Sequence, residues 1–174
     1  MGYVNIFPVK DHYYFMSMAL EQAYRANGEG EVPVGAVIVK RGEVIAKAYN
    51  QVIKRNDPTA HAEISALREA ASILKNYRLI DTILYVTVEP CLMCGGALIQ
   101  ARVNKLIFGT FDPKMGAFGS IYNLAEDKRL NHRIEVESGI LEEECCQLIK
   151  IFFKKKRRGT EEAITGSTRN RLVL

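Results

Sequence analysis

The segment 82–90 reads TILYVTVEP and decides the fold, because it is almost uniformly apolar over the length of one strand. A run of this kind is typical of a central strand that is covered on both faces of a sheet. Pro90 ends the strand, since proline cannot donate to a sheet ladder. Residues 91–103, CLMCGGALIQARV, then have the pattern of a helix. The chain is therefore expected to pass from a central strand directly into a helix.

The segments on either side of this strand and helix contain the other predicted strands and helices of an α/β fold. Residues 11–27 place apolar side chains at helical spacing, and the glycines of NGEGEVP end that pattern. Two β-branched runs at 34–40 and 44–50 predict a hairpin. The remaining predicted elements are a helix over 57–75 opened by Asp57, Pro58 and Thr59, strands over 105–111 and 132–139, and a final amphipathic helix over 140–158.

This order of elements predicts an α/β fold with a central five-stranded mixed sheet flanked by helices. Strands that alternate with helices in the second half indicate parallel crossovers, and the early hairpin adds an antiparallel pair. A chain of 174 residues with 48% hydrophobic composition has the size of one ordinary domain, which we place at residues 1–158. Residues 159–174 are polar and poor in core-forming side chains, as is typical of a disordered tail.

The bulk properties favour a cytoplasmic protein that does not enter a membrane. No apolar run approaches the roughly 18 residues needed to cross a bilayer, and the first residues lack the order of a signal peptide. The net charge of +4 is concentrated at the end of the chain, where residues 154–174 hold seven basic and two acidic residues, a net +5. This localised charge favours contact with a polyanion, and a solvated tail is the alternative.

Cysteine spacing points to a metal centre. Cys91 and Cys94 lie three residues apart at the start of a predicted helix, where the helix dipole favours their thiolate forms. His61 also lies near a predicted helix start and can meet them if the two strand-to-helix junctions are neighbours. Cys145 follows the apolar spacing of the last helix and is predicted to be a core residue.

A structural zinc site has four protein ligands, whereas three ligands leave one coordination position for a water. Two thiolates cancel the charge of Zn²⁺ and weaken its effect on that water, so a nearby base is needed. Glu63, two residues after His61, is the candidate proton carrier for the activated water. Taken alone, His61 could be a packed histidine, Glu63 a solvated surface glutamate, and Cys91 with Cys94 a redox pair. The combination H-x-E followed by P-C-x-x-C is far more specific than its parts.

The residues HAE and PCLMC resemble the signature of the zinc-dependent cytidine and adenosine deaminase superfamily. The resemblance extends over about residues 12–158 to bacterial tRNA-specific adenosine deaminases. Its segments are EVPVGAVIV, NDPTAHAEI, NYRLIDTILYVTVEPCLMCGGALI, FGTFDPKMGAFGS, LNHRIEV and FFKKKRR. It implies a three-layer cytidine-deaminase-like fold, one Zn²⁺ per subunit, a homodimer, and conversion of adenosine to inosine at the wobble position of a tRNA anticodon stem-loop.

Four further residues are candidates for substrate binding. The resemblance implies that Asn50 holds the purine and that Asp112 contacts a neighbouring nucleotide. Lys114, two residues later, is a candidate for a phosphate contact, and Phe153 lies about 100° off the apolar stripe of the last helix, which leaves it available to RNA.

The sequence leaves two rival functions open. One is a deaminase of free nucleosides or bases with the same zinc centre, which five consecutive basic residues disfavour. The other is a zinc-stabilised RNA-binding module without chemistry, for which a fourth protein ligand would be the mark.

Overall fold

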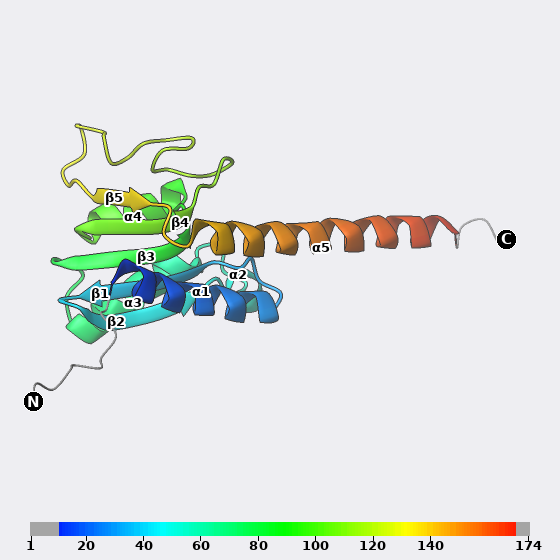
Figure 1. Ribbon diagram of the computed structural model, residues 1–174, viewed down its shortest axis with the longest axis horizontal. Helices are drawn as coiled ribbons and strands as arrows, with labels where there is room; N and C mark the ends of the chain where they lie inside the picture. Colours follow the sequence, from blue (N-terminus) through cyan, green and yellow to red (C-terminus); the bar gives the residue numbers. More distant parts are fainter. Residues whose placement is uncertain (1–10, 170–174) are drawn as a thin grey trace, which may run out of the picture.

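The computed structural model describes residues 11–169, with side chains described through Arg158 (Figure 1). Its elements, in chain order, are α1 (His12–Gly28), β1 (Gly35–Lys40), β2 (Glu43–Tyr49), α2 (Val52–Arg55), α3 (Ala62–Leu74), β3 (Thr82–Val88), α4 (Leu92–Gln100), β4 (Lys105–Thr110), β5 (Glu135–Ser138) and α5 (Glu142–Arg169).

One five-stranded sheet runs through the molecule in the order β2-β1-β3-β4-β5. The pairs of β1 with β2 and with β3 are antiparallel, whereas β3, β4 and β5 run parallel. The mixed sheet expected from the sequence is therefore confirmed. The segment 82–90 contributes the central strand β3, whose residues are nearly all buried because helices cover both of its faces.

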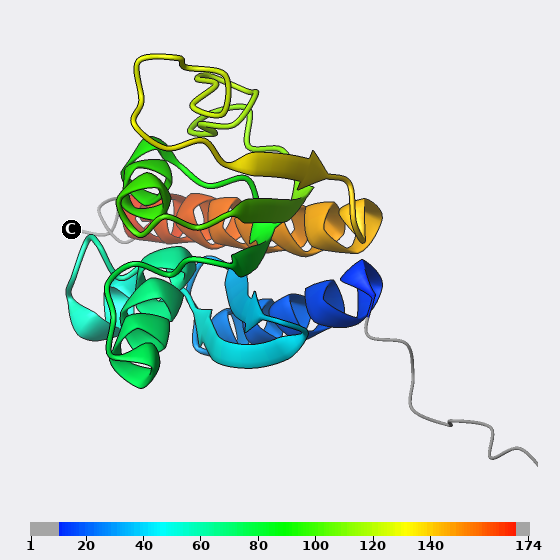
Figure 2. The same ribbon diagram turned by 90° about the vertical axis from the view of Figure 1, so that its left-hand side faces the viewer.

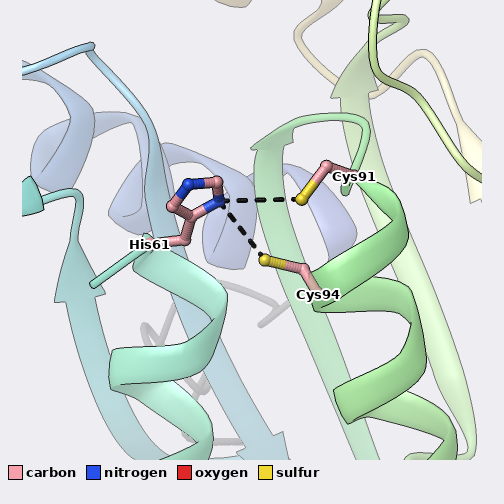
Figure 3. A group of neighbouring side chains, drawn as sticks. All are labelled: His61, Cys91 and Cys94. Carbon is pink, nitrogen blue, oxygen red and sulfur yellow. Dashed lines mark hydrogen bonds between the residues drawn. The ribbon is translucent and has the colours of Figure 1, made fainter. Parts of the chain in front are cut away.

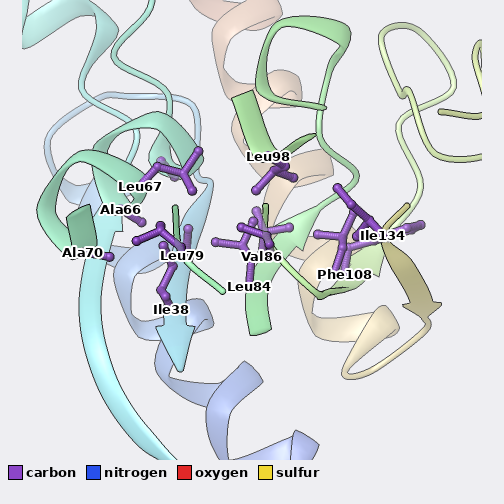
Figure 4. Packing of buried hydrophobic residues seen from close by; sticks show 14 of the residues in the cluster. Ile38, Ala66, Leu67, Ala70, Leu79, Leu84, Val86, Leu98, Phe108 and Ile134 are labelled. Atoms are coloured by element: carbon purple, nitrogen blue, oxygen red, sulfur yellow. The ribbon is translucent and has the colours of Figure 1, made fainter. Parts of the chain in front are cut away.

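Alternate residues of the strands face opposite layers of helices. Ala36 and Ile38 of β1 join the core beneath α3 and α4, with Leu84 and Val86 of β3 (Figure 4). Val37 and Val39 of β1 and Tyr85 of β3 instead pack against α1 and the first turns of α5. Seen along the sheet, α3 and α4 lie on one side and α1 on the other (Figure 2). This alternation gives the three-layer arrangement.

The helix expected over 57–75 begins later than predicted, at Ala62. Asp57 does not cap it. Its Oδ1 accepts hydrogen bonds from the backbone N–H of Thr59 at 2.8 Å and from the Thr59 hydroxyl at 2.7 Å. Aspartate and threonine favour such local turns as readily as helix starts, and the short α2, which the sequence did not predict, precedes this turn. The correction places His61, rather than Thr59, at the N-cap of α3.

The last helix agrees with its predicted pattern and extends further. Cys145, Leu148 and Phe152 are buried at 2%, 7% and 7% exposure, whereas Phe153 is 44% exposed. The backbone of α5 remains helical to Arg169 and projects beyond the end of the sheet where β3, β4 and β5 terminate (Figure 1). Residues 170–174 of the expected tail lie outside the described residues. No helix in the described part of the chain has the length and apolarity to span a membrane.

Candidate metal centre

The metal ligands come from the starts of two helices that share one edge of the sheet. Helix α3 leads the chain back to the edge of the sheet where β3 begins, and α4 leads it back to the same edge, where the parallel strand β4 begins. Both helices therefore begin at the edge where β3 and β4 end. His61 is the N-cap residue of α3, Cys91 is the N-cap residue of α4, and Cys94 follows in the first turn.

Backbone conformation turns the ligands toward each other. His61 has φ −68° and ψ 156°, and Cys91 has φ −73° and ψ 172°, so both residues are extended immediately before their helices. Neither side chain caps its own helix, which leaves the imidazole and the thiol free to point across the gap (Figure 3). Pro90 stops β3 just before Cys91 and so fixes where this extended residue falls.

The distances between the three side chains fit a zinc ion. His61 Nδ1 lies 3.7 Å from Cys91 Sγ and 3.5 Å from Cys94 Sγ, and the three ligand atoms all lie within 4.8 Å of one another. A tetrahedral zinc with sulfur at about 2.3 Å and nitrogen at about 2.0 Å separates such N and S ligands by about 3.5 Å. The three residues therefore already have the spacing of a tetrahedral metal centre.

Proton affinities at the two sulfurs favour occupation by a cation. A hydrogen bond with Cys94 lowers the pKa of Cys91 to about 4, and the same hydrogen bond, with burial, raises the pKa of the Cys94 thiol far above its usual range. Ionisation of one sulfur thus disfavours ionisation of the other. A divalent cation held between them stabilises both thiolates and removes this competition.

The centre has three protein ligands and no fourth among the side chains that the structure describes. The other two histidines are engaged elsewhere: His12 Nδ1 contacts the Tyr85 hydroxyl at 2.9 Å, and His132 Nε2 donates to the carbonyl of Val103 at 2.7 Å. Cys145 belongs to the core beneath α1 and α5. Three ligands are the mark of a catalytic zinc that keeps one position open, so the centre does not fit the purely structural rival.

Glu63 lies in the first turn of α3, beside the ligands, and is only 4% exposed. Burial raises the pKa of its carboxyl group, while the charge of His61 acts in the opposite direction. A carboxyl group in such a dry position is suited to accept and return a proton.

Asn50 ends the hairpin at the same edge and is 6% exposed. Its Nδ2 donates to Glu31 Oε2 at 3.2 Å, and the next residue, Gln51, donates its N–H to the carbonyl of Ala60 at 3.0 Å. Asn50 is therefore held next to the segment that carries His61. The sequence did not single out Glu31, whose burial at 1% exposure could not be read from its polar surroundings.

The loop after β4 brings Asp112 and Lys114 to the same edge of the sheet. Gly116 pairs with Cys91 in an isolated bridge, and Ala117 donates its N–H to the carbonyl of Pro90 at 2.9 Å. Asp112 Oδ1 accepts from the N–H of Lys114 at 2.9 Å, and Lys114 is exposed. Phe153, by contrast, lies on α5, which packs on the opposite face of the sheet from α3 and α4.

A three-ligand zinc centre at the start of two helices, over a mixed five-stranded sheet, defines a zinc-binding deaminase. Residues 9–110 match the family described as the cytidine and deoxycytidylate deaminase zinc-binding region. The tRNA-specific adenosine deaminase of Haemophilus influenzae is 49% identical over 82% of this chain and 83% of its own length. That of Bacillus subtilis is 45% identical over 86% of this chain and 92% of its own length. The chain belongs to the family of bacterial tRNA-specific adenosine deaminases.

Solved structures agree with this assignment. A tRNA:A34 deaminase studied for A-to-I editing at the wobble position of transfer RNA aligns with a TM-score of 0.76 and 42% identity, covering 78% of this chain and 98% of that one. A guanine deaminase from Nitrosomonas europaea aligns with a TM-score of 0.71 and 26% identity, covering 82% of this chain and 84% of that one. The fold is thus shared with deaminases of free bases.

Loss of a ligand should empty the metal centre without unfolding the protein. We expect His61→Ala and Cys91→Ser to reduce bound zinc from about one ion per chain to less than roughly a tenth after dialysis, because two ligands cannot hold the ion against buffer. Cys146→Ser, which changes a cysteine outside the centre, is the matched control and should keep its zinc. Full zinc content in both ligand variants, measured by atomic emission, would contradict the assignment.

Proposed function

We propose that this protein deaminates adenosine to inosine at the wobble position of a tRNA anticodon loop, by hydrolysis. The observation that carries the proposal is the three-ligand centre with the buried Glu63 beside it. The family assignment supports the choice of substrate. Since the proposed substrate is tRNA, we place the reaction in the cytoplasm.

His61, Cys91 and Cys94 would hold zinc, which would supply a Lewis acid to lower the pKa of the water that attacks C6 of adenine. Glu63 accepts the proton of that water and transfers it to N1, which makes C6 more electrophilic. The same carboxyl group then carries the second proton of the water to the exocyclic amine, which leaves as ammonia. Water and adenosine are thereby converted to ammonia and inosine, with Glu63 returned to its starting state.

The target base must leave its stack to reach C6, and the cost is lowest in a flexible single-stranded loop. We propose that Asn50 holds the purine. Its hydrogen bond to Glu31 fixes the orientation of the amide, which suits a polar contact with a planar base. Asp112 and Lys114 are proposed contacts for the flanking nucleotides, because their loop lies against Cys91.

The basic part of α5 is the proposed contact for the RNA backbone. Five consecutive exposed cations, Lys154, Lys155, Lys156, Arg157 and Arg158, follow the exposed ring of Phe153. This helix projects beyond the end of the sheet where β3 and β4 terminate (Figure 1). The starts of α3 and α4, which carry the metal ligands, lie at the same end. Charges for phosphates and an aromatic ring for stacking are the usual means of holding single-stranded RNA.

We also propose a homodimer. Large apolar side chains, each at least 38% exposed, lie at the start of α4 and on the loop that packs against it: Leu92, Met93, Met115, Ile121 and Tyr122. The loop is joined to this helix start by the bridge between Cys91 and Gly116, so these side chains occupy one region of the surface. A second copy of the chain would remove this apolar area from water.

The central test uses an anticodon stem-loop with a wobble adenosine and measures inosine by nuclease digestion and chromatography. We expect the protein to form inosine, and Glu63→Gln to lower the rate roughly 10²-fold to 10⁴-fold while zinc content and RNA affinity are unchanged, because only proton transfer is removed. Glu69→Gln, on the exposed side of α3, should be fully active. Conversion of free adenosine, cytidine or guanine alone would instead identify a free-base or nucleoside deaminase, and near-normal turnover by Glu63→Gln would rule out the mechanism.

Replacing the five cations at 154–158 by glutamine should weaken binding of the stem-loop and flatten its dependence on salt. Each phosphate contact that is lost should reduce the slope of log K against log salt by about 0.7. Lys40→Gln with Lys47→Gln, on the β1–β2 hairpin, is the control and should preserve the slope. An unchanged slope in the 154–158 variant, measured by fluorescence anisotropy, would show that these cations only solvate the helix.

The homodimer can be tested by sedimentation velocity. Ile121→Glu should shift the protein toward monomer, because a buried charge at the interface would lack a partner. Ile73→Glu, at an equally exposed isoleucine on α3, should leave the dimer intact. A protein that is monomeric at all micromolar concentrations would refute the dimer.

A further inference from the structure

A second buried carboxylate lies next to the metal centre and takes no part in the chemistry described above. Glu89 follows the last residue of β3 and precedes Pro90 and Cys91, and it is only 3% exposed. Among the described residues no lysine, arginine or histidine forms an ion pair with it. A buried carboxylate without a counter-ion is costly unless several donors solvate it, so its partners indicate its role.

All four hydrogen bonds to the Glu89 carboxylate come from the loop after β4. Oε1 accepts from the N–H of Phe118 at 2.8 Å and from the N–H of Ser120 at 3.1 Å. Oε2 accepts from the N–H of Asp112 at 3.0 Å and from the hydroxyl of Ser120. One side chain thus holds both ends of the segment 112–120.

The loop packs closely against this carboxylate at Gly116. A Cβ atom added to Gly116 would lie 2.1 Å from Glu89 Oε2 and 2.3 Å from Cδ, far inside a normal contact. Gly116 has an ordinary negative φ, so the glycine is required by space and not by backbone conformation. The loop therefore closes around the carboxylate with a glycine at the point of closest approach.

The bond to Asp112 links this clamp to the proposed RNA contacts. The hydrogen bond from its N–H to Glu89 fixes the position of Asp112. The Asp112 carboxylate in turn accepts hydrogen bonds from the N–H groups of Lys114 at 2.9 Å and Met115 at 3.3 Å. Between β4 and β5 the described chain forms no helix or strand that could hold these residues. Glu89 connects the position of Asp112 and Lys114 to the segment that carries the ligand Cys91.

We propose that Glu89 is a positioning residue that fixes the loop 112–120 over the metal centre and thereby sets the affinity for the RNA substrate, acting through Asp112. The inference rests on the proposed function, because it takes Asp112 and Lys114 to be RNA contacts. Glu89 touches neither the substrate nor the reacting atoms. Its removal affects capture of the stem-loop more than the chemical step.

Glu89→Gln is the sharpest variant. Its amide oxygen can still accept from Phe118 and Ser120, and the Ser120 hydroxyl can rotate to accept from the new amide N–H. The N–H of Asp112 then faces a donor, so the bond to Asp112 is the one that must break. We expect KM for the anticodon stem-loop to rise about tenfold or more, with kcat within about threefold of the wild type and zinc content unchanged.

A double-mutant cycle with Asp112→Ala separates this role from a purely structural one. If Glu89 acts through Asp112, then Glu89→Gln should raise KM little further in the Asp112→Ala background. Additive effects of the two substitutions on KM would overturn the proposal. A fall in kcat and zinc content without a change in KM would also overturn it, because the residue would then serve the metal ligands.

Gly116→Ala tests the clamp without changing the carboxylate. The added methyl group should displace Glu89 and reproduce the rise in KM, whereas Gly28→Ala, where nothing lies within 4 Å of the new Cβ, should leave KM unchanged. Unchanged KM in a folded, zinc-containing Gly116→Ala protein would overturn the proposal. Failure of the wild type to convert the stem-loop would refute the proposed function itself, a result distinct from all of these.

Discussion

The structure depends on two helices beginning at the same edge of the sheet. Because α3 leads into β3 and α4 leads from β3 into the parallel strand β4, both helices must run in the same direction. Their first residues are therefore neighbours, which brings His61 Nδ1 within 3.5 Å and 3.7 Å of the two sulfurs. The apolar core beneath α3 and α4 fixes both helices on the sheet. A shift of either helix along the sheet would separate the imidazole from the thiols, so the metal centre depends on this core.

Three buried glutamates lie around this centre, and their different environments suit them to the different roles proposed for them. Glu63 lies in a dry position where burial raises the pKa of its carboxyl group, which suits the exchange of protons. Glu31 and Glu89 are equally buried but accept hydrogen bonds from backbone N–H groups, of Lys54 at 2.7 Å and of the loop 112–120 respectively. Those two carboxylates hold the segments around the metal centre in place through these hydrogen bonds.

Much of this arrangement follows from local sequence patterns. The apolar run at 82–90 predicted the central strand, and the period of the last helix correctly predicted that Cys145 is buried and that Phe153 is exposed. The start of α3 was misplaced because Asp57 and Thr59 carry the same signals for a turn as for a helix N-terminus. The metal ligands could be found because histidine and cysteine are rare and their spacing is chemically restricted. Glutamate is common, so Glu31 and Glu89 gave no comparable signal.

The sequence by itself determined the order of the five strands and of the longer helices along the chain. It also pointed to the three metal ligands and the neighbouring glutamate, because each depends on residue type and short-range spacing. Tertiary structure alone decided that the ligand atoms lie at the separation expected around a tetrahedral zinc and that no fourth ligand is near them among the described side chains. It also decided that Glu89 holds a loop more than twenty residues away in sequence. Those facts depend on which strands are neighbours and on which polar groups are shielded from water. Both are properties of the packed sheet and its helices, which no local pattern of residues encodes.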